Sequence, residues 1–462
     1  MDAIHHAGIR RALYVDLDGT LVRTDTLWES LILAAKRHPL RLFPLLARLA
    51  GDRAAFKKGV GRLAIPDPSL LPYDAEVLAF VRRHRERGGD AILATAADAA
   101  IARAVADHLG VFTAVLASDG RTNNAGAAKR DAVLAHSAGR PFEYMGDGMA
   151  DEAVFRVAAT SHRVVAGSRL PFAAVGDTLR MKQWMKNLLV FVPVFLSHRI
   201  TEGPLVGTAL AAFAAFSFCA SAVYVVNDLW DLEADRSHPA KRRRPLARGT
   251  MRIPDALAVA AASLVAGFAV AASFLPPALL LILTGYLFVT SFYTFWLKRI
   301  TVLDVIVIAL CYACRVIAGS VATGVQLSGW LVVFSVFFFR SLAFLKRFSE
   351  LAMRRSQGLA DREASRGYTT ADTEVVRLLG VGSGVAAVFV MALYVTNPQV
   401  TVLYGRPAAL WAVVLATLYW LGRVWLLAGR GAIKDDPFIF TVGDRASYAT
   451  AALMAIVLAF AS

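Results

Sequence analysis

The feature that most constrains this sequence is the uneven distribution of charge and hydropathy along its 462 residues. Charged residues are frequent in residues 1–186, whereas long apolar runs fill residues 187–462. The chain as a whole is 57% hydrophobic and has a mean hydropathy of +0.52, which is high for a soluble protein. Its length also exceeds that of one ordinary domain. We therefore predict a water-soluble domain over residues 1–175 and an all-α membrane domain over residues 176–462.

The apolar part of the chain predicts about nine membrane-spanning helices. Most of the runs are long enough to cross the hydrocarbon core of a bilayer. The first run is short and the last lies close to the end of the chain, so the sequence also allows eight. The expected segments are residues 184–197, 205–226, 254–272, 276–296, 301–321, 328–347, 373–395, 407–426 and 446–461.

Basic residues in the loops between these runs predict the orientation of the chain. With nine crossings, nearly all loop cations lie on the side of the N-terminal domain, including the run from Arg236 to Arg252. The positive-inside rule places that side in the cytoplasm, which indicates a multi-pass protein of a bacterial inner (cytoplasmic) membrane. The same loops account for much of the net charge of +15, so membrane lipids and phosphorylated substrates are better partners than nucleic acid. A homo-oligomer is left open.

Four short apolar runs in the first part of the chain alternate with helical patterns. They lie at residues 12–18, 91–94, 115–117 and 143–145, and a helical stretch occupies about residues 28–63. Strands that alternate with helices predict an α/β domain with a parallel sheet. Ligands of such domains bind at the carboxyl edge of the strands.

Side chains suited to phosphoryl transfer follow these predicted strands. Asp16 and Asp18 end the first strand, where one carboxylate can attack phosphorus and the other can protonate the leaving oxygen. Thr95 ends the second strand, where a hydroxyl can hold a phosphoryl oxygen. Lys129 can neutralise charge on the transferred phosphoryl group.

Two further carboxylates, Asp147 and Asp151, follow the fourth predicted strand and suit a Mg²⁺ ion shared with a substrate. With the preceding residues in this order, residues 10–170 resemble the haloacid dehalogenase (HAD) superfamily. The resemblance implies a Rossmann-like (Rossmannoid) phosphatase with a small helical cap, in which Asp16 is the nucleophile and Asp18 the acid and base. Thr95 and Lys129 would bind phosphate. The residues it assigns to magnesium are Asp16, Asp18, Asp147 and Asp151. A catalytically inactive regulatory module is the alternative.

An acidic cluster closes the second apolar run. On a helix Asp228, Asp231 and Asp235 fall at i, i+3 and i+7, so their carboxylates share one face, with Asn227 beside them. Carboxylates at a membrane boundary are costly unless they bind a cation, and Mg²⁺ that bridges to a diphosphate meets this requirement. The basic run from Lys241 to Arg244 follows closely and suits phosphate oxygens.

These residues resemble the UbiA superfamily of intramembrane prenyltransferases over about residues 178–462, and most closely its decaprenyl-phosphate phosphoribosyltransferases. Aromatic prenyltransferases usually carry a second aspartate-rich motif, but here the stretch from Tyr293 to Asp304 has one aspartate and two cations. This departure fits a phosphoribosyl diphosphate donor and a polyprenyl (decaprenyl-like) phosphate acceptor. Arg315 falls well inside its predicted helix, where an unpaired charge is hard to explain without a ligand.

The resemblance also implies which residues carry the membrane reaction. Asp228 and Asp231 would be catalytic and, with Asn227 and Asp235, would hold Mg²⁺. The residues that it places on the two substrates are Lys182, Lys186, Asn227, Lys241, Arg244, Tyr293, Lys298, Asp304, Arg315, Lys346, Arg366 and Tyr368.

Together, the two resemblances imply that the chain catalyses two consecutive reactions. The membrane domain would make a polyprenyl phosphate that carries 5-phosphoribose, and the phosphatase would remove the remaining phosphomonoester. The product, polyprenyl-phosphoryl-ribose, would supply pentose for cell-envelope biosynthesis. The alternatives are an aromatic prenyltransferase with an isoprenyl diphosphate donor, and a non-enzymatic lipid-phosphate carrier.

Overall fold

A computed structural model describes residues 11–47, 52–164, 172–356, 367–398, 404–433 and 436–461. The chain forms two compact units. Unit 1 contains Met1–Leu179 and Tyr224–Ala261, and unit 2 contains Arg180–Val223 and Ala262–Ser462. The segment with the acidic cluster therefore folds with the α/β part of the chain, although it lies far from that part in sequence.

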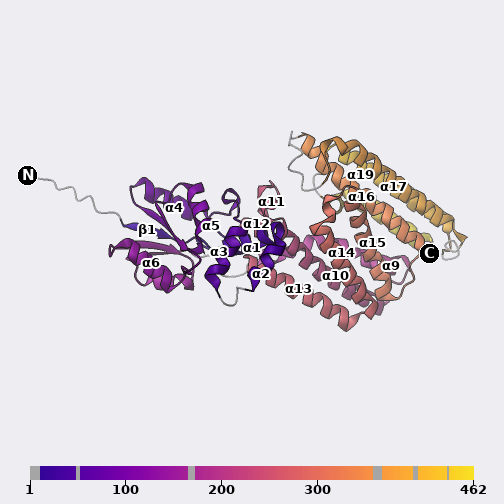
Figure 1. Ribbon diagram of the computed structural model, residues 1–462. Helices are drawn as coiled ribbons and strands as arrows, with labels where there is room; N and C mark the ends of the chain where they lie inside the picture. The colour runs from indigo at the N-terminus through magenta and orange to yellow at the C-terminus, as the bar shows by residue number, and fades with distance from the viewer. Residues whose placement is uncertain are drawn as a thin grey trace, which may run out of the picture. The chain divides into compact units, whose positions relative to one another are not determined.

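Unit 1 is built on a five-stranded parallel sheet with the order β3-β2-β1-β4-β5. Its central strand, β1, is labelled in Figure 1. The predicted α/β architecture is confirmed. Four strands match the predicted runs, whereas the polar sequence of β5 gives no apolar run from which a strand is predicted. The strands are β1 (Ala12–Val15), β2 (Ala91–Asp98), β3 (Ala114–Ser118), β4 (Phe142–Gly146) and β5 (Thr160–Arg163).

Helices cover both faces of this sheet because alternate residues of a strand point to opposite sides. Leu13 and Val15 pack with α4 (Ala75–Glu86) and α5 (Ala99–Leu109). Tyr14 packs on the other face, with α6 (Ala127–Ser137) and α7 (Glu152–Phe155). Accordingly, α4 and α6 lie on opposite sides of β1 in Figure 1.

A small helical cap is inserted between β1 and β2. It consists of α1 (Thr26–Arg37), α2 (Pro39–Leu46) and α3 (Arg53–Leu63), which pack around Leu33, Phe56 and Val60. The single helical stretch predicted over residues 28–63 is therefore interrupted. Pro39 has no N–H to continue α1 and instead begins α2, and the Asp52 carboxylate caps α3.

The rest of unit 1 consists of α8 and of a second stretch of the chain, Tyr224–Ala261. This stretch contains the end of the first membrane helix, α10, the start of the second, α13, and the short elements between them. These elements are α8 (Phe172–Thr178), α10 (Gly203–Trp230), α11 (Leu232–Ser237), η4 (Lys241–Arg243), α12 (Pro245–Arg248) and α13 (Ile253–Phe274).

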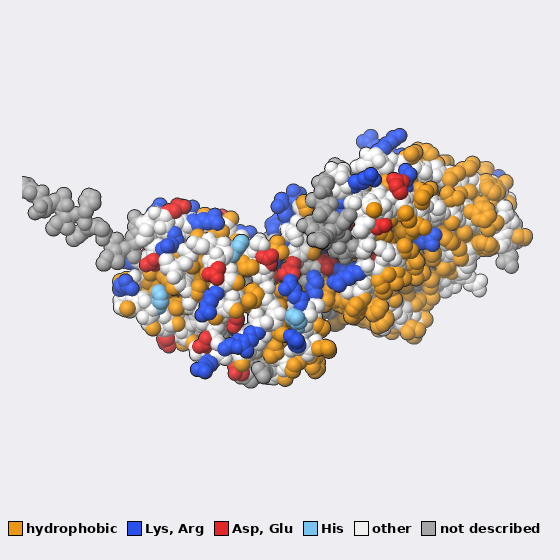
Figure 2. Space-filling model, turned by 45° about the horizontal axis from the view of Figure 1, so that its top comes forward, with side chains coloured by type: hydrophobic (Ala, Val, Ile, Leu, Met, Phe, Trp, Pro, Cys, Tyr) orange, Lys and Arg blue, Asp and Glu red, His pale blue; other side chains and the backbone are white. Residues whose placement is uncertain are grey.

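Within the described residues, seven helices are long and apolar enough to cross a membrane. Figure 2 shows hydrophobic side chains over much of the visible face of the helical part, as expected for a surface in contact with lipid. The chain is thus an integral membrane protein. Besides α10 and α13, the spans contain α14 (Pro277–Phe295), α15 (Leu303–Thr323), α16 (Gly329–Ser356), α17 (Thr373–Thr396) and α19 (Leu410–Gly429).

The expected count of nine spans is not reached in the described ranges, and the difference lies in the first and last segments. Residues 184–197 form a 3₁₀ helix, η3 (Met181–Phe191), and one short α-helix, α9 (Val192–Leu196). Residues 446–461 form α21 (Arg445–Ala461), which at 17 residues is shorter than the seven spans. Both segments are apolar, but each is shorter than the roughly 20 residues that usually cross a bilayer.

Candidate active sites

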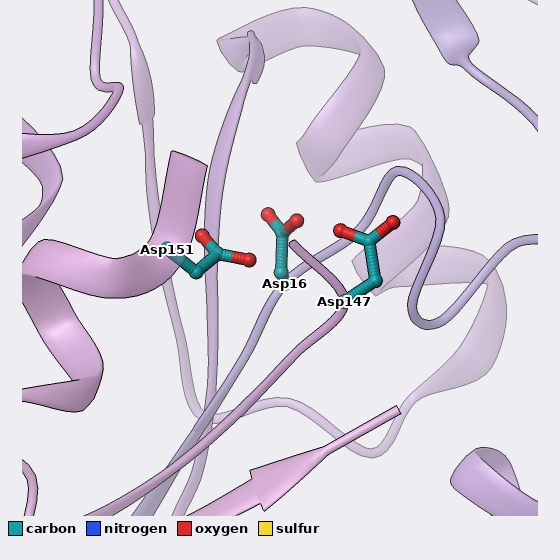
Figure 3. A group of neighbouring side chains, drawn as sticks. All are labelled: Asp16, Asp147 and Asp151. Atoms are coloured by element: carbon teal, nitrogen blue, oxygen red, sulfur yellow. The ribbon is translucent and has the colours of Figure 1, made fainter. Parts of the chain in front are cut away.

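Three carboxylates meet at the carboxyl edge of the sheet in unit 1. Asp16 follows β1, Asp147 follows β4, and Asp151 ends the 3₁₀ turn η2 (Met149–Asp151). One oxygen of each lies within 4.8 Å of one oxygen of the other two. Figure 3 shows the Asp16 carboxylate between those of its two neighbours. The strands β1 and β4 are adjacent and parallel, so the residues that follow them share this edge.

A buried lysine and a tyrosine hold two of these carboxylates in place. Lys129 Nζ lies 2.8 Å from Asp16 Oδ1 and 2.7 Å from Asp151 Oδ1, and the Tyr144 hydroxyl donates to Asp151 Oδ1 at 2.7 Å. Asp151 Oδ2 is buried and accepts no hydrogen bond from the described residues. Because an unsatisfied buried oxygen is costly, this arrangement fits a cation bound among the three carboxylates.

Asp18 differs from Asp16 in its surroundings. Its Oδ1 accepts a hydrogen bond of 2.8 Å from the backbone N–H of Thr26, and it is not one of the three converging carboxylates. Burial and the nearby Asp25 carboxylate raise the pKa of Asp18 to about 8. Burial raises the pKa of Asp16 only to about 6, because Lys129 opposes it. The pKa of Asp18 is therefore the higher of the two, which is the order that an acid and a nucleophile require.

A cavity of about 190 Å³ opens above these groups. Thr95 does not line it: its hydroxyl accepts a hydrogen bond from the Ala97 N–H at 3.0 Å. The cap residue Lys57 does line it, and its ammonium group donates to the Ala96 carbonyl at 2.7 Å. The lining residues are Asp16, Asp18, Asp25, Thr26, Leu27, Lys57, Ala96, Ala97, Asp98, Ile101, Ala125, Gly126, Lys129, Asp147, Ala150 and Asp151.

Three charged lining residues, Asp25, Lys57 and Asp98, have no counterpart among the predicted site residues. From the sequence, Asp25 and Asp98 can be predicted only as helix caps. Each directly precedes a helix, and its carboxylate accepts hydrogen bonds from backbone N–H groups in the first turn. Lys57 lies on α3 within an ordinary helical pattern, so the sequence contains no sign of its place in the cavity.

The acidic cluster of unit 1 does not lie on one continuous helix. The helix α10 ends at Trp230 and α11 begins at Leu232, so the single helix predicted to carry Asp228, Asp231 and Asp235 is interrupted at Asp231. Asp231 occupies the position before α11, which aspartate favours over a helix interior. Among the described residues, these three carboxylates do not converge within 4.8 Å as those at the sheet edge do.

An arginine joins two members of this cluster. Arg244 NH1 lies 3.0 Å from Asp228 Oδ1 and also pairs with Asp235 Oδ2, and both aspartates are buried. Lys241 Nζ lies 3.9 Å from Asp235 Oδ1. The predicted acidic and basic motifs are thus in direct contact. A bound diphosphate would compete with the two aspartates for Arg244.

In unit 2, two of the predicted lysines share one carboxylate. Lys186 and Lys346 place their Nζ atoms 2.7 Å and 3.3 Å from Asp436 Oδ2. Burial alone would raise the pKa of Asp436, but the two ammonium groups hold it well below its usual range. Asp436 has no counterpart among the predicted site residues, because it lies in a short loop far along the chain.

Arg315 has hydrogen-bonding partners inside its helix bundle. Its Nε donates to Asn187 Oδ1 at 2.6 Å, and its NH2 donates to the Tyr286 hydroxyl at 2.9 Å. The guanidinium also lies over the Tyr286 ring, with its carbon 5.0 Å from the ring centroid. These partners explain how the charge is accommodated without a ligand, so burial alone no longer argues for a substrate contact.

Asp304 is buried between two partners. Arg347 donates to one carboxylate oxygen at 2.8 Å, and the Tyr368 hydroxyl donates to the other at 2.7 Å. Lys298 is also buried, Tyr293 and Asn227 are half-buried, and Lys182 is exposed. Arg366 lies outside the described residues. The buried environment of Asp304 suits a structural ion pair as well as a binding role.

We predict that Asp304→Asn lowers the thermal unfolding temperature of the detergent-purified protein. The substitution leaves the buried Arg347 without its fully buried counter-charge, which costs about 3 kcal/mol. The matched control is Glu350→Gln, which removes the 42% exposed partner of the same arginine and is expected to cost less than about 1 kcal/mol. Equal melting temperatures for the two variants would contradict a structural role for Asp304.

Known proteins resemble this chain in both parts. The protein y4nM of Sinorhizobium fredii, which is described as uncharacterized, is 35% identical over 96% of this chain and 89% of its own length. It therefore shares the α/β part as well as the helical part. The decaprenyl-phosphate phosphoribosyltransferase of Mycobacterium tuberculosis is 36% identical over 203 residues, which are 43% of this chain and 67% of that enzyme.

The helical part also matches a family and a solved structure. A UbiA homolog from Archaeoglobus fulgidus, solved with DMAPP and Mg²⁺, covers 62% of this chain and 97% of its own, with 18% identity and a TM-score of 0.48. Residues 188–460 match the UbiA prenyltransferase family. This chain is therefore an integral membrane enzyme of the UbiA prenyltransferase family.

Proposed function

We propose that the chain makes polyprenyl-phosphoryl-ribose in two consecutive reactions, the first in residues 176–462 and the second in residues 1–175. The first transfers 5-phosphoribose from phosphoribosyl diphosphate to a polyprenyl phosphate and releases diphosphate. The second hydrolyses the 5-phosphate. The observation that carries the first reaction is the 36% identity to a decaprenyl-phosphate phosphoribosyltransferase over 67% of that enzyme. The second reaction is supported by the three converging carboxylates at the sheet edge and by the Lys129 ammonium group that pairs with two of them.

In the transferase reaction, an oxygen of the lipid phosphate attacks the anomeric carbon of the donor. The bond from that carbon to the diphosphate oxygen breaks, and diphosphate leaves. With Arg244 drawn away to the diphosphate, Asp228, Asp231 and Asp235 would hold Mg²⁺, which would neutralise charge on that leaving group. Arg244 and Lys241 contact these carboxylates and are suited to its phosphate oxygens. Lys186 and Lys346 are cations suited to the second anionic substrate.

In the hydrolytic reaction, the α/β domain acts as a HAD-type phosphatase. Asp16 attacks phosphorus to form an aspartyl-phosphate, and Asp18 gives its proton to the departing ribose oxygen. The ionised Asp18 then takes a proton from water, which attacks the aspartyl-phosphate and releases inorganic phosphate. Lys129 contacts Asp16 and Asp151 and balances negative charge through both steps. Mg²⁺ held by Asp16, Asp147 and Asp151 would neutralise charge on the phosphoryl group.

Fusion of the two domains makes chemical sense because the product of the first reaction still carries a phosphomonoester. Tethering raises the concentration of the second active site around that product. The relative from Sinorhizobium fredii spans both domains as well. From the basic loops we infer that the N-terminal domain lies in the cytoplasm, at an inner membrane, on the side where phosphoribosyl diphosphate would be available to the transferase.

The proposal is tested with detergent-purified protein, Mg²⁺, polyprenyl phosphate and phosphoribosyl diphosphate labelled in the ribose. Label in the lipid fraction and release of diphosphate are expected. Transfer of an isoprenyl group to an aromatic acceptor, without ribose transfer, would instead identify an aromatic prenyltransferase. Binding of polyprenyl phosphate without diphosphate release under either condition would identify a carrier.

A further inference from the structure

A buried ion pair joins the phosphatase cap to the aspartate-rich segment within unit 1. The Glu29 carboxylate on α1 receives two hydrogen bonds from the Arg236 guanidinium on α11, at 2.6 and 3.0 Å. The two side chains are only 4% and 6% exposed. The Thr24 hydroxyl donates to the same carboxylate at 2.7 Å, and Arg236 Nε donates to the Ala247 carbonyl at 3.2 Å. A bidentate, desolvated pair of this kind fixes the relative position of the elements that carry it.

The helix α1 also fixes the position of the proposed phosphatase acid. Its first residue, Thr26, donates its backbone N–H to Asp18 Oδ1 at 2.8 Å. Glu29 lies in the same first helical turn as Thr26. Because backbone atoms within one turn of a helix move together, a shift at Glu29 is transmitted to the N–H that holds Asp18.

The other partner of the pair belongs to the aspartate-rich segment. Arg236 directly follows Asp235, which shares Arg244 with Asp228. A second close contact lies nearby, where Gly249 has a φ of +72° and a Cβ there would lie 2.6 Å from the Arg23 carbonyl oxygen. Only glycine meets both conditions. The segment after the first membrane span is therefore packed closely against the residues that enter α1.

We propose that Glu29 and Arg236 are positioning residues through which the aspartate-rich segment of the transferase holds the phosphatase acid, Asp18, in place. The inference rests on the proposed phosphatase function and adds that the phosphatase site depends on a segment of the transferase domain. It makes the phosphatase site complete only when the segment of the transferase is folded against the cap. In such an arrangement hydrolysis does not run independently of the transferase domain.

The test compares two soluble phosphomonoesters in the full-length, detergent-purified protein. Ribose 5-phosphate has a poor leaving group that needs a proton from Asp18, whereas p-nitrophenyl phosphate releases a stable anion. Since kcat/KM reports the steps up to aspartyl-phosphate formation, a displaced acid harms the first substrate selectively. For Glu29→Gln we expect kcat/KM for ribose 5-phosphate to fall at least about tenfold more than kcat/KM for p-nitrophenyl phosphate.

Arg37→Gln is the matched control, because it removes an exposed ion pair between the same two helices, α1 and α11. Arg37 NH2 lies 3.5 Å from Glu233 Oε2, and the arginine side chain is 52% exposed. It is expected to leave both substrates within about twofold of wild type. Arg236→Lys keeps the charge but loses the two-pronged contact, so a smaller selective loss is expected. This variant serves as the reporter if Glu29→Gln does not fold.

Three other results would contradict the inference, and they can be told apart. An equal loss for both substrates would show a general structural role, and no loss would show that the pair does not position Asp18. If the wild-type protein cleaves neither phosphomonoester, the proposed phosphatase function itself fails, and the inference fails with it.

Discussion

Replacement of Asp16 by asparagine is expected to leave the lipid product with its 5-phosphate. An amide cannot attack phosphorus, and the substitution also removes the carboxylate that lies 2.8 Å from Lys129. Loss of a nucleophile lowers the rate by a factor on the order of 10⁴ or more. Labelled ribose should therefore still enter lipid, and the accumulated product should release inorganic phosphate only when a separate phosphatase is added.

The control for this experiment is Asp131→Asn, the same substitution at a 62% exposed residue of α6 that pairs only with the adjacent Arg130 among the described contacts. It should form the dephosphorylated lipid as the wild type does. If Asp16→Asn still forms that lipid at the wild-type rate, Asp16 is not the nucleophile and the α/β domain has another role.

The site at the sheet edge was largely predictable because strand-end positions determine it. In a parallel sheet the residues after adjacent strands must lie together, so Asp16, Asp147 and Asp151 follow from the sequence pattern. Thr95 differs because β2 extends beyond it to Asp98. The hydroxyl therefore lies within the strand rather than at its end.

The cap residues at this site were not predictable in the same way. Lys57 reaches the cavity only because three cap helices pack together, and Glu29 meets Arg236 across some two hundred positions of sequence. Such contacts depend on tertiary packing, which hydrophobic periodicity does not encode. Local patterns therefore predicted the three converging carboxylates but not the residues that enclose and orient them.

In the membrane domain, too, the sequence predicts the helices but not the contacts of their charged side chains. Apolar runs predict all seven spans, because a long run without charge is specified by composition alone. The partners of buried charges are not specified in that way. Asp304 pairs with Arg347 and Lys186 pairs with Asp436, contacts that depend on how the helices and the loops between them pack. Charged residues inside spans could thus be identified from the sequence, but their roles could not.

Replacement of Asp228 by asparagine is expected to stop diphosphate release and to leave phosphomonoester hydrolysis nearly unchanged. Asp228 is buried and shares Arg244 with Asp235, so the substitution weakens both the proposed Mg²⁺ site and the placement of the cation beside it. Loss of electrostatic stabilisation at a leaving group lowers the rate about 10²- to 10³-fold. The measurement is diphosphate release from phosphoribosyl diphosphate with polyprenyl phosphate, set beside hydrolysis of p-nitrophenyl phosphate in the same preparation.

Glu233→Gln is the matched control, because Glu233 lies in the same segment but has a more exposed side chain that pairs with Arg37. It should release diphosphate at close to the wild-type rate. If both variants keep full transferase activity, the acidic cluster does not bind the donor. Its pairing with Arg244 would then be structural, and the site of ribose transfer would have to lie among the cations of unit 2. A loss confined to Asp228→Asn, with hydrolysis intact, would instead assign the two reactions to separate groups of residues in one chain.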